Sequence, residues 1–292
     1  MTIMKKRIIL VIGVFVVIIS AGVLMWQYSI SKYPEHIFNM NIDRLWNESQ
    51  GENIVIAFLD SGMHQKLADV YGERVVDPYD FVNDREVFTD TNGHGTALIC
   101  IETCKYEDTG VYGIAPQAKV MPLRIFDSNG NTSDERIVDA IRYAVDNGAD
   151  IINMSFGSYE ESIEVENVIN YAYLNNVFVI CSAGEHITYS TAFPAKNDKT
   201  IGIGDKSDYE YGVGHEDIDF FLEGNNIPSL RFSDSENDLI FNTEKGSSVS
   251  TAMFSGIIAL KISNMQDIDK IEFLIYLFED SKIYSIIDII NY

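Results

Sequence analysis

The sequence predicts an α/β protein in which helices flank a mostly parallel sheet, preceded by one N-terminal transmembrane helix. Short apolar, β-branched runs alternate with segments of helical periodicity, which is typical of strand–helix–strand units. No internal repeat, low-complexity tract or Pro-rich linker interrupts this alternation. A chain of 292 residues can bury the core of one large domain. We therefore expect an N-terminal segment, 1–32, followed by one domain, 33–292.

The N-terminal segment has the pattern of a membrane anchor. Three basic residues at 5–7 precede the apolar stretch 8–26, and the next charge is Lys32. This length can span a bilayer as a helix. A cleaved signal peptide is the alternative, although no clear A-x-A site follows the stretch. The basic cluster should stay in the cytoplasm, which predicts a single-pass membrane protein with an extracytoplasmic domain, or alternatively a secreted one.

The strands and helices are predicted from periodicity and from the residues that end each run. Five apolar runs predict buried strands: 53–59, 120–125, 151–154, 177–181 and 201–203. Four amphipathic or apolar segments predict helices: 96–104, 133–147, 164–175 and 250–265. Gly148 can end the second of these helices. In a parallel sheet, functional sites form at the carboxyl ends of the strands.

Charge and cysteine content exclude some functions. The chain has 44 acidic and 21 basic side chains, for a net charge of −23. Nucleic acid is not an expected partner, because phosphate binding needs clustered Lys and Arg. The acidity serves solubility, and part of it could serve cation sites. Cys100, Cys104 and Cys181 are too few for a disulfide framework, and we expect them to pack in the core.

Three stretches carry residues of catalytic type. Asp60-Ser61-Gly62 directly follows a predicted strand, Asn92-Gly93-His94-Gly95-Thr96 opens a helix, and Gly246–Ala252 opens another around Ser248. Each residue has a structural explanation when taken singly, as a turn cap, a buried histidine or a helix N-cap. Together they are the members of a nucleophilic triad, in the chain order of subtilisin-like enzymes.

At these residues the chain resembles the subtilisin-like serine proteases, or subtilases. IVIAFLDSG, NGHGT and GSSVSTAMFSG are similar to the family's Asp, His and Ser motifs. The segments 113–130, 149–157 and 193–195 are similar to its connecting strands, substrate-binding strand and conserved turn, so that the resemblance covers most of residues 36–265. It implies a three-layer fold and hydrolysis of polypeptide substrates by a serine endopeptidase.

The resemblance implies a role for each matched residue. Asp60 would orient His94, and His94 would act as general base and then as general acid. Ser248 would be the nucleophile that forms the acyl-enzyme, and its backbone N–H would supply one oxyanion donor. Ser155 and Gly157 would lie on the strand that pairs with the substrate, and Asn92 would flank the histidine.

One departure from the family pattern concerns the oxyanion hole. Glu185, in CSAGEH, stands where the family has an Asn that donates the second hydrogen bond. An ionised carboxylate donates nothing and repels the oxyanion, whereas a protonated carboxyl can donate. The sequence therefore predicts a slow, pH-sensitive peptidase. The alternative is a pseudoprotease, a subtilase fold that binds peptides or another protein without efficient cleavage.

The family resemblance also concerns calcium and folding. The segment 105–111 matches a Ca²⁺-binding loop of the family, and Asp69 matches its distant carboxylate ligand. With Glu107 in the loop, these oxygens would suit structural Ca²⁺, while an ordinary acidic surface loop is the alternative. Secreted subtilases fold on a pro-segment that this sequence lacks, so we expect it to fold alone or with a partner.

Overall fold

The computed structural model describes residues 33–90, 92–106, 110–184, 190–207, 217–233, 238–266 and 272–273. The predicted anchor, 1–32, lies outside them. Within the described residues, no helix has the length and apolar character needed to cross a membrane.

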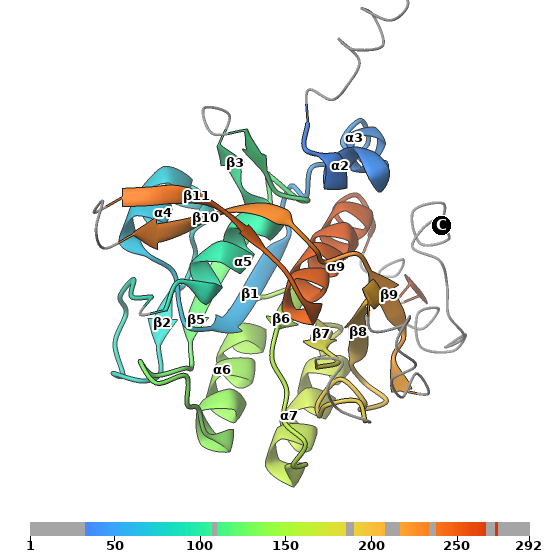
Figure 1. Cartoon of the computed structure of the whole chain (residues 1–292). Helices are drawn as coiled ribbons and strands as arrows, with labels where there is room; N and C mark the ends of the chain where they lie inside the picture. Colours follow the sequence, from blue (N-terminus) through green and yellow to red (C-terminus); the bar gives the residue numbers. More distant parts are fainter. Residues whose placement is uncertain are drawn as a thin grey trace, which may run out of the picture.

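A seven-stranded sheet forms the centre of the fold (Figure 1). Its strand order is β2-β5-β1-β6-β7-β8-β9, and every neighbouring pair is parallel. The strands are β1 (Val55–Asp60), β2 (Tyr79–Asp80), β5 (Lys119–Arg124), β6 (Ile151–Met154), β7 (Phe178–Ser182), β8 (Ile201–Asp205) and β9 (Phe220–Leu222). The predicted parallel sheet is confirmed.

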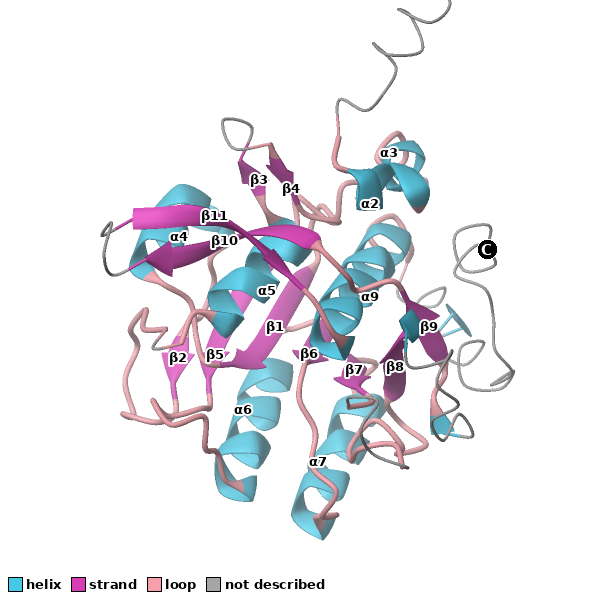
Figure 2. Ribbon diagram, viewed as in Figure 1, coloured by secondary structure: helices cyan, strands magenta, loops and turns pink. Residues whose placement is uncertain are grey.

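Helices cover both faces of this sheet, as Figure 2 shows. Successive side chains of a strand point to opposite faces, so Ile56 and Phe58 of β1 join one apolar cluster and Ala57 and Leu59 join the other. The first cluster includes α5 (His94–Thr103) and α9 (Ser247–Ile262), and the second includes α6 (Asp134–Asp146) and α7 (Ile163–Leu174). The result is a helix–sheet–helix architecture of three layers.

Smaller elements lie around this centre. They are α2 (Glu35–Asn39), α3 (Ile42–Leu45), α4 (Gln65–Tyr71), the 3₁₀ helix η1 (Gly72–Arg74), β3 (Lys105–Tyr106), β4 (Val111–Tyr112), β10 (Ile227–Ser233) and β11 (Asp238–Glu244). The antiparallel hairpin β10–β11 packs against α5. Figure 1 shows it crossing this helix on the face of the sheet that also carries α9.

The predicted elements are present, with shifted ends. β1 begins at Val55 because Asn53 lies in a turn with a φ of 66°. α5 begins at His94 and not at 96, and α9 runs from Ser247 to Ile262 and not from 250 to 265. Ser133 and Ser162 cap α6 and α7 through their hydroxyls, and Gly148 follows α6 with a φ of 77°.

The three cysteines are free and buried, as the sequence predicts. The hairpin β10–β11 was not predicted, because its two strands are only partly buried and lack a clear alternation of apolar and polar residues.

Candidate active site

The candidate site lies at the carboxyl ends of two neighbouring central strands. Asp60 is the last residue of β1, and Ser155 follows the last residue of β6, which pairs with β1. α9 begins at Ser247, so Ser248 belongs to its first turn. The sheet topology therefore brings three segments together that are far apart in the sequence.

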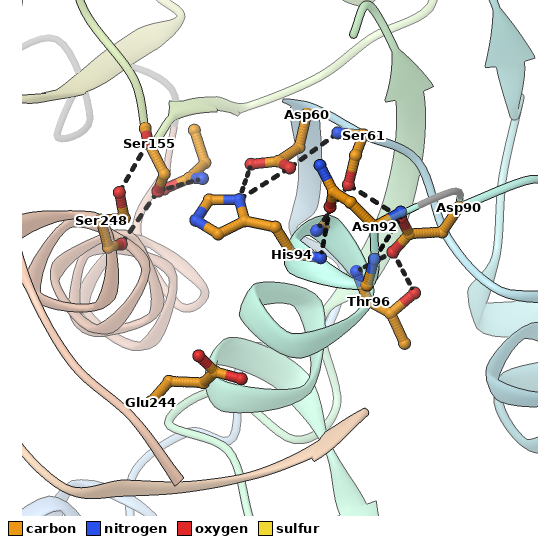
Figure 3. A network of polar contacts seen from close by, with 12 residues as sticks. Asp60, Ser61, Asp90, Asn92, His94, Thr96, Ser155, Glu244 and Ser248 are labelled. Carbon is orange, nitrogen blue, oxygen red and sulfur yellow. Dashed lines mark hydrogen bonds and ion pairs between the residues drawn. The ribbon is translucent and has the colours of Figure 1, made fainter. Parts of the chain in front are cut away.

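Asp60 and His94 form a close pair (Figure 3). His94 Nδ1 lies 2.9 Å and 3.0 Å from the two Asp60 carboxylate oxygens, and Ser61 N donates to Asp60 Oδ1 at 2.7 Å. Asp60 is only 2% exposed, whereas the His94 side chain is 37% exposed. Because a carboxylate accepts from Nδ1–H, the other ring nitrogen, Nε2, is left available to a reacting group.

A glycine lets the two residues approach. A Cβ atom at Gly95 would lie 2.3 Å from the carbonyl oxygen of Gly62 and 3.2 Å from the Asp60 Cβ. Any side chain there would push α5 away from β1. The glycine after the histidine is thus required by the Asp60–His94 contact.

Asp90, which the sequence analysis missed, organises the loop before α5. Its carboxylate accepts hydrogen bonds from Ser61 Oγ, from the backbone N–H groups of Asn92, Gly93 and Thr96, and from the Thr96 hydroxyl. An Asp shortly before a helix start is a capping signal that could have identified it. Asn92 Oδ1 accepts from His94 N at 2.8 Å. The predicted substrate-side residue Asn92 therefore also fixes the start of the histidine helix.

Ser248 is held against Ser155 by two reciprocal hydrogen bonds. Ser248 Oγ donates to the Ser155 carbonyl oxygen at 2.8 Å, and Ser155 Oγ donates to the Ser248 carbonyl oxygen at 2.9 Å. Ser248 and His94 are both described by the structure, and no hydrogen bond joins them directly. Catalytic hydrogen bonds are often formed only when substrate is bound.

The first turn of α9 supplies backbone donors. Ser248 N–H is one of the first amide groups of the helix, which have no intrahelical acceptor, and the helix dipole favours negative charge at this end. The predicted second oxyanion residue, Glu185, lies outside the described residues. β7 and the following Gly184 lead up to it.

Charge around His94 favours its protonated form. The pKa of His94 is raised from 6.5 to about 9, mainly by the Asp60 carboxylate and further by Asp90 and Glu244, while burial opposes the shift. His94 is therefore largely protonated at neutral pH in the absence of substrate.

A cavity of about 270 Å³ lies beside the segment that follows β6. Gly157 borders it, and a Cβ atom there would lie 2.7 Å from the Ala192 Cβ. The lining is mixed, with apolar side chains such as Phe126 and Val165 and acidic side chains such as Glu160 and Glu161. It lies beside the segment on which the sequence predicts that substrate binds.

The expected calcium ligands are not assembled in the described residues. Asp69 is exposed on α4, and its Oδ1 accepts a hydrogen bond from Gln65 at 2.8 Å. Glu107 lies outside the described residues. Elsewhere in the described part of the chain, no three His, Cys, Asp or Glu side chains come together as a metal site would require. Because Glu107 is one of the two predicted carboxylate ligands, calcium binding stays a prediction.

The fold and the site together define an α/β protein with an Asp–His–Ser set at the ends of parallel strands. The family model described as the subtilase family matches residues 51–273. The chain belongs to the subtilase family, whose matched relatives are named as serine proteases.

Three relatives illustrate this similarity. The chain is 25% identical over 256 residues to an intracellular serine protease of Paenibacillus polymyxa, covering 83% of this chain and 77% of the relative. It is 33% identical over 174 residues to a thermophilic serine proteinase of Bacillus sp. (strain AK1), covering 59% of this chain and 43% of that relative. It is 29% identical over 159 residues to thermitase of Thermoactinomyces vulgaris, covering 54% of this chain and 57% of that relative. The match thus spans about half the length of the latter two relatives.

Proposed function

We propose that this protein is a serine endopeptidase that cleaves polypeptides through Asp60, His94 and Ser248. The observation that carries the proposal is the Asp60–His94 pair, which lies at the strand ends beside the first turn of α9. Ser is a weak nucleophile until a neighbouring base takes its proton, and this geometry supplies the base together with the acid that orients it.

The reaction proceeds in two halves. Ser248 Oγ leaves its hydrogen bond to the Ser155 carbonyl, transfers its proton to His94 Nε2 and attacks the substrate carbonyl carbon. His94 then gives that proton to the leaving amine as the C–N bond breaks, which leaves an acyl-enzyme. A water molecule then gives a proton to His94 and attacks the ester carbonyl. His94 returns that proton to Ser248 Oγ as the ester C–O bond breaks, which releases the acid product. Asp60 stabilises the imidazolium in both halves.

Substrate is proposed to lie along residues 155–157. The cavity that Gly157 borders is proposed to receive one side chain of the substrate. Asn92 flanks His94 on the substrate side.

The Ser248 N–H is the proposed first oxyanion donor, and Glu185 is proposed to act as the second when it is protonated. This makes a slow enzyme the expected outcome. Loss of one such donor in a subtilisin lowers kcat by about 10²–10³, far less than loss of a complete triad.

A second candidate function is that of a peptide- or protein-binding pseudoprotease. The observation that favours it is the Ser248 hydroxyl, which donates to Ser155 and is not bonded to His94. In a binder this arrangement would persist when a peptide occupies the site.

Labelling with a fluorophosphonate probe separates the two functions. The wild-type protein should form a covalent adduct at Ser248, and Ser248→Ala should form none. Peptidase activity that survives in purified Ser248→Ala would remove Ser248 from the mechanism. A wild-type protein that binds peptides but is never labelled would support the pseudoprotease.

The N-terminal segment 8–26 is proposed to anchor the enzyme in the membrane, with the domain on the extracytoplasmic side. Its length and the basic residues before it support this proposal. Fractionation of cells and protease accessibility of the domain test it, and release of the mature domain into the medium would favour a cleaved signal peptide.

A further inference from the structure

A third carboxylate near His94 is held by an arginine from the hairpin. Glu244 ends β11, three residues before α9 begins, and its side chain is 16% exposed. Figure 3 shows Glu244 across the imidazole from Asp60, and its charge contributes to the raised pKa of His94. The Glu244 charge thus acts on the imidazole without a hydrogen bond between the two side chains.

Arg231, on β10, contacts both Glu244 and the histidine loop. Its Nε lies 3.0 Å from Glu244 Oε1, and its Nη2 donates to Glu244 Oε2 at 3.4 Å. Its aliphatic part packs on Gly93, where a Cβ atom would lie only 3.0 Å from the Arg231 Cγ. Asn242 Nδ2 donates to Glu244 Oε1 at 2.7 Å. The Glu244 carboxylate is thus held on the hairpin by two side chains, one of them charged.

The charges that face His94 come from four elements. Among the described residues, the carboxylates that act on the His94 pKa are Asp60 on β1, Asp90 in the loop before α5 and Glu244 on β11. The fourth charge, Arg231 on β10, is the ion-pair partner of Glu244 and packs on Gly93. Three of these four are negative, in a chain whose net charge is −23. An imidazole in such surroundings is driven toward its protonated form, in which it is no longer a base. Arg231 is the one cation of the four.

We propose that Arg231 is a positioning residue for the catalytic pair: its guanidinium holds Glu244 on the hairpin and offsets its charge, so that His94 keeps Asp60 as its partner and leaves Nε2 to Ser248. This inference rests on the proposed peptidase function for its activity readout. The guanidinium is suited to the role because it remains charged at all relevant pH values. Its Nη2 donates the hydrogen bond to Glu244, whereas Nε contacts Oε1 as an ion pair without hydrogen-bond geometry.

A double-mutant cycle on Arg231 and Glu244 tests the proposal. Arg231→Gln leaves an uncompensated carboxylate near the imidazole, so the pKa of His94 should rise by about one pH unit. Glu244→Gln should lower it. The double variant should return it toward the wild-type value, because the two charges act on His94 in opposite directions. Arg231→Lys keeps the charge and should retain most of the wild-type titration.

The first readout is an NMR titration of His94 in the Ser248→Ala background, which needs no activity. The signal is assigned by its loss in His94→Gln. Lys66→Gln is the control, because it removes the Lys66–Asp238 ion pair at the other end of the same hairpin. It should leave the His94 titration unchanged.

The second readout is the pH dependence of kcat/KM on one peptide substrate. The acid limb of this profile should follow the pKa of His94. It should move to higher pH in Arg231→Gln and return toward the wild-type position in the double variant. A uniform loss of rate at all pH values, with an unshifted His94 titration, would mean a merely structural role and would overturn the proposal. If Arg231→Gln does not fold, the Glu244→Gln variant tests the proposal instead. An unchanged His94 pKa in Glu244→Gln would refute the proposal. Absence of fluorophosphonate labelling in the wild type would instead count against the proposed function, and the NMR cycle would still stand.

Discussion

Replacing the buried Glu102 with glutamine should stabilise the protein increasingly as the pH rises. Glu102 lies on α5 with 0% exposure, and neither carboxylate oxygen has a hydrogen-bond partner among the described residues. It faces α9, where a Cβ atom at Gly256 would lie 3.3 Å from the Glu102 Cγ. Burial raises its pKa well above 4.5, so the folded protein keeps this carboxyl protonated where the unfolded chain ionises it.

The magnitude follows from this difference in proton binding. Below pH 4.5 the carboxyl is protonated in both the folded and the unfolded state, so its raised pKa does not change the free energy of unfolding. Above pH 4.5 only the unfolded chain ionises, and the free energy of unfolding falls as the pH rises. While Glu102 stays protonated in the folded state, each pH unit lowers the free energy of unfolding by about 1.4 kcal/mol. For a domain of this size, that is a change in Tm of roughly 3–6 °C per pH unit.

The assay is thermal unfolding at several pH values in the Ser248→Ala background, which prevents self-digestion. The quantity compared is the Tm of Glu102→Gln minus that of its parent, which should widen from pH 5.5 to 6.5. Glu102→Leu should be more stable still, by about 1–3 kcal/mol, since it also removes the unsatisfied polar atoms. Glu166→Gln, at an exposed position of α7, is the control and should follow the parent. Parallel Tm curves for Glu102→Gln and parent would refute the reasoning.

Three further predictions concern the site and the metal. Because the pKa of His94 is raised to about 9 and the base must be neutral, the acid limb of kcat/KM should lie well above the 6.5 of a free imidazole. Asp60→Asn should move this limb toward 6.5 and lower kcat by about 10⁴, and an unmoved limb in the pH–rate profile would contradict the assignment. Glu185→Asn should raise kcat by about 10² and extend activity to higher pH, which a comparison of kcat against pH for the two proteins measures. A variant as slow as its parent would show that the second oxyanion donor does not limit kcat. If Asp69 binds Ca²⁺, the wild-type protein should have a higher Tm in calcium than in chelator, and Asp69→Ala should not. Calorimetry measures both, and an equal calcium response in the two proteins would show that Asp69 is not a ligand.

Much of the fold could be predicted from local sequence patterns. The apolar runs and the capping residues are local signals, and β1, β5, β6, β7 and β8 lie where those runs predict. Asp60 and His94 stand in short motifs that carry Gly62 and Gly95, and Gly95 permits the close approach of α5 to the segment after β1. For that reason the Asp60–His94 pair could be expected before any coordinates were known.

The surroundings of this pair were decided by the tertiary structure. Glu244 and Arg231 come from a hairpin more than 130 residues after His94, and nothing in their local sequence shows that the hairpin packs on α5. The direction of the Ser248 hydroxyl, toward Ser155, likewise depends on how α9 meets the end of β6.

The sequence by itself determined which side chains are proposed to perform the chemistry, since motif spacing and strand–helix periodicity are properties of short segments. The tertiary structure alone decided the charge around them and the burial of Glu102. α5 is predicted as a helix from its sequence, but it lies between the sheet, α9 and the hairpin, so residues 95–103 are all buried. Electrostatic and desolvation energies depend on neighbours distant in the chain, and the order of residues does not reveal those neighbours.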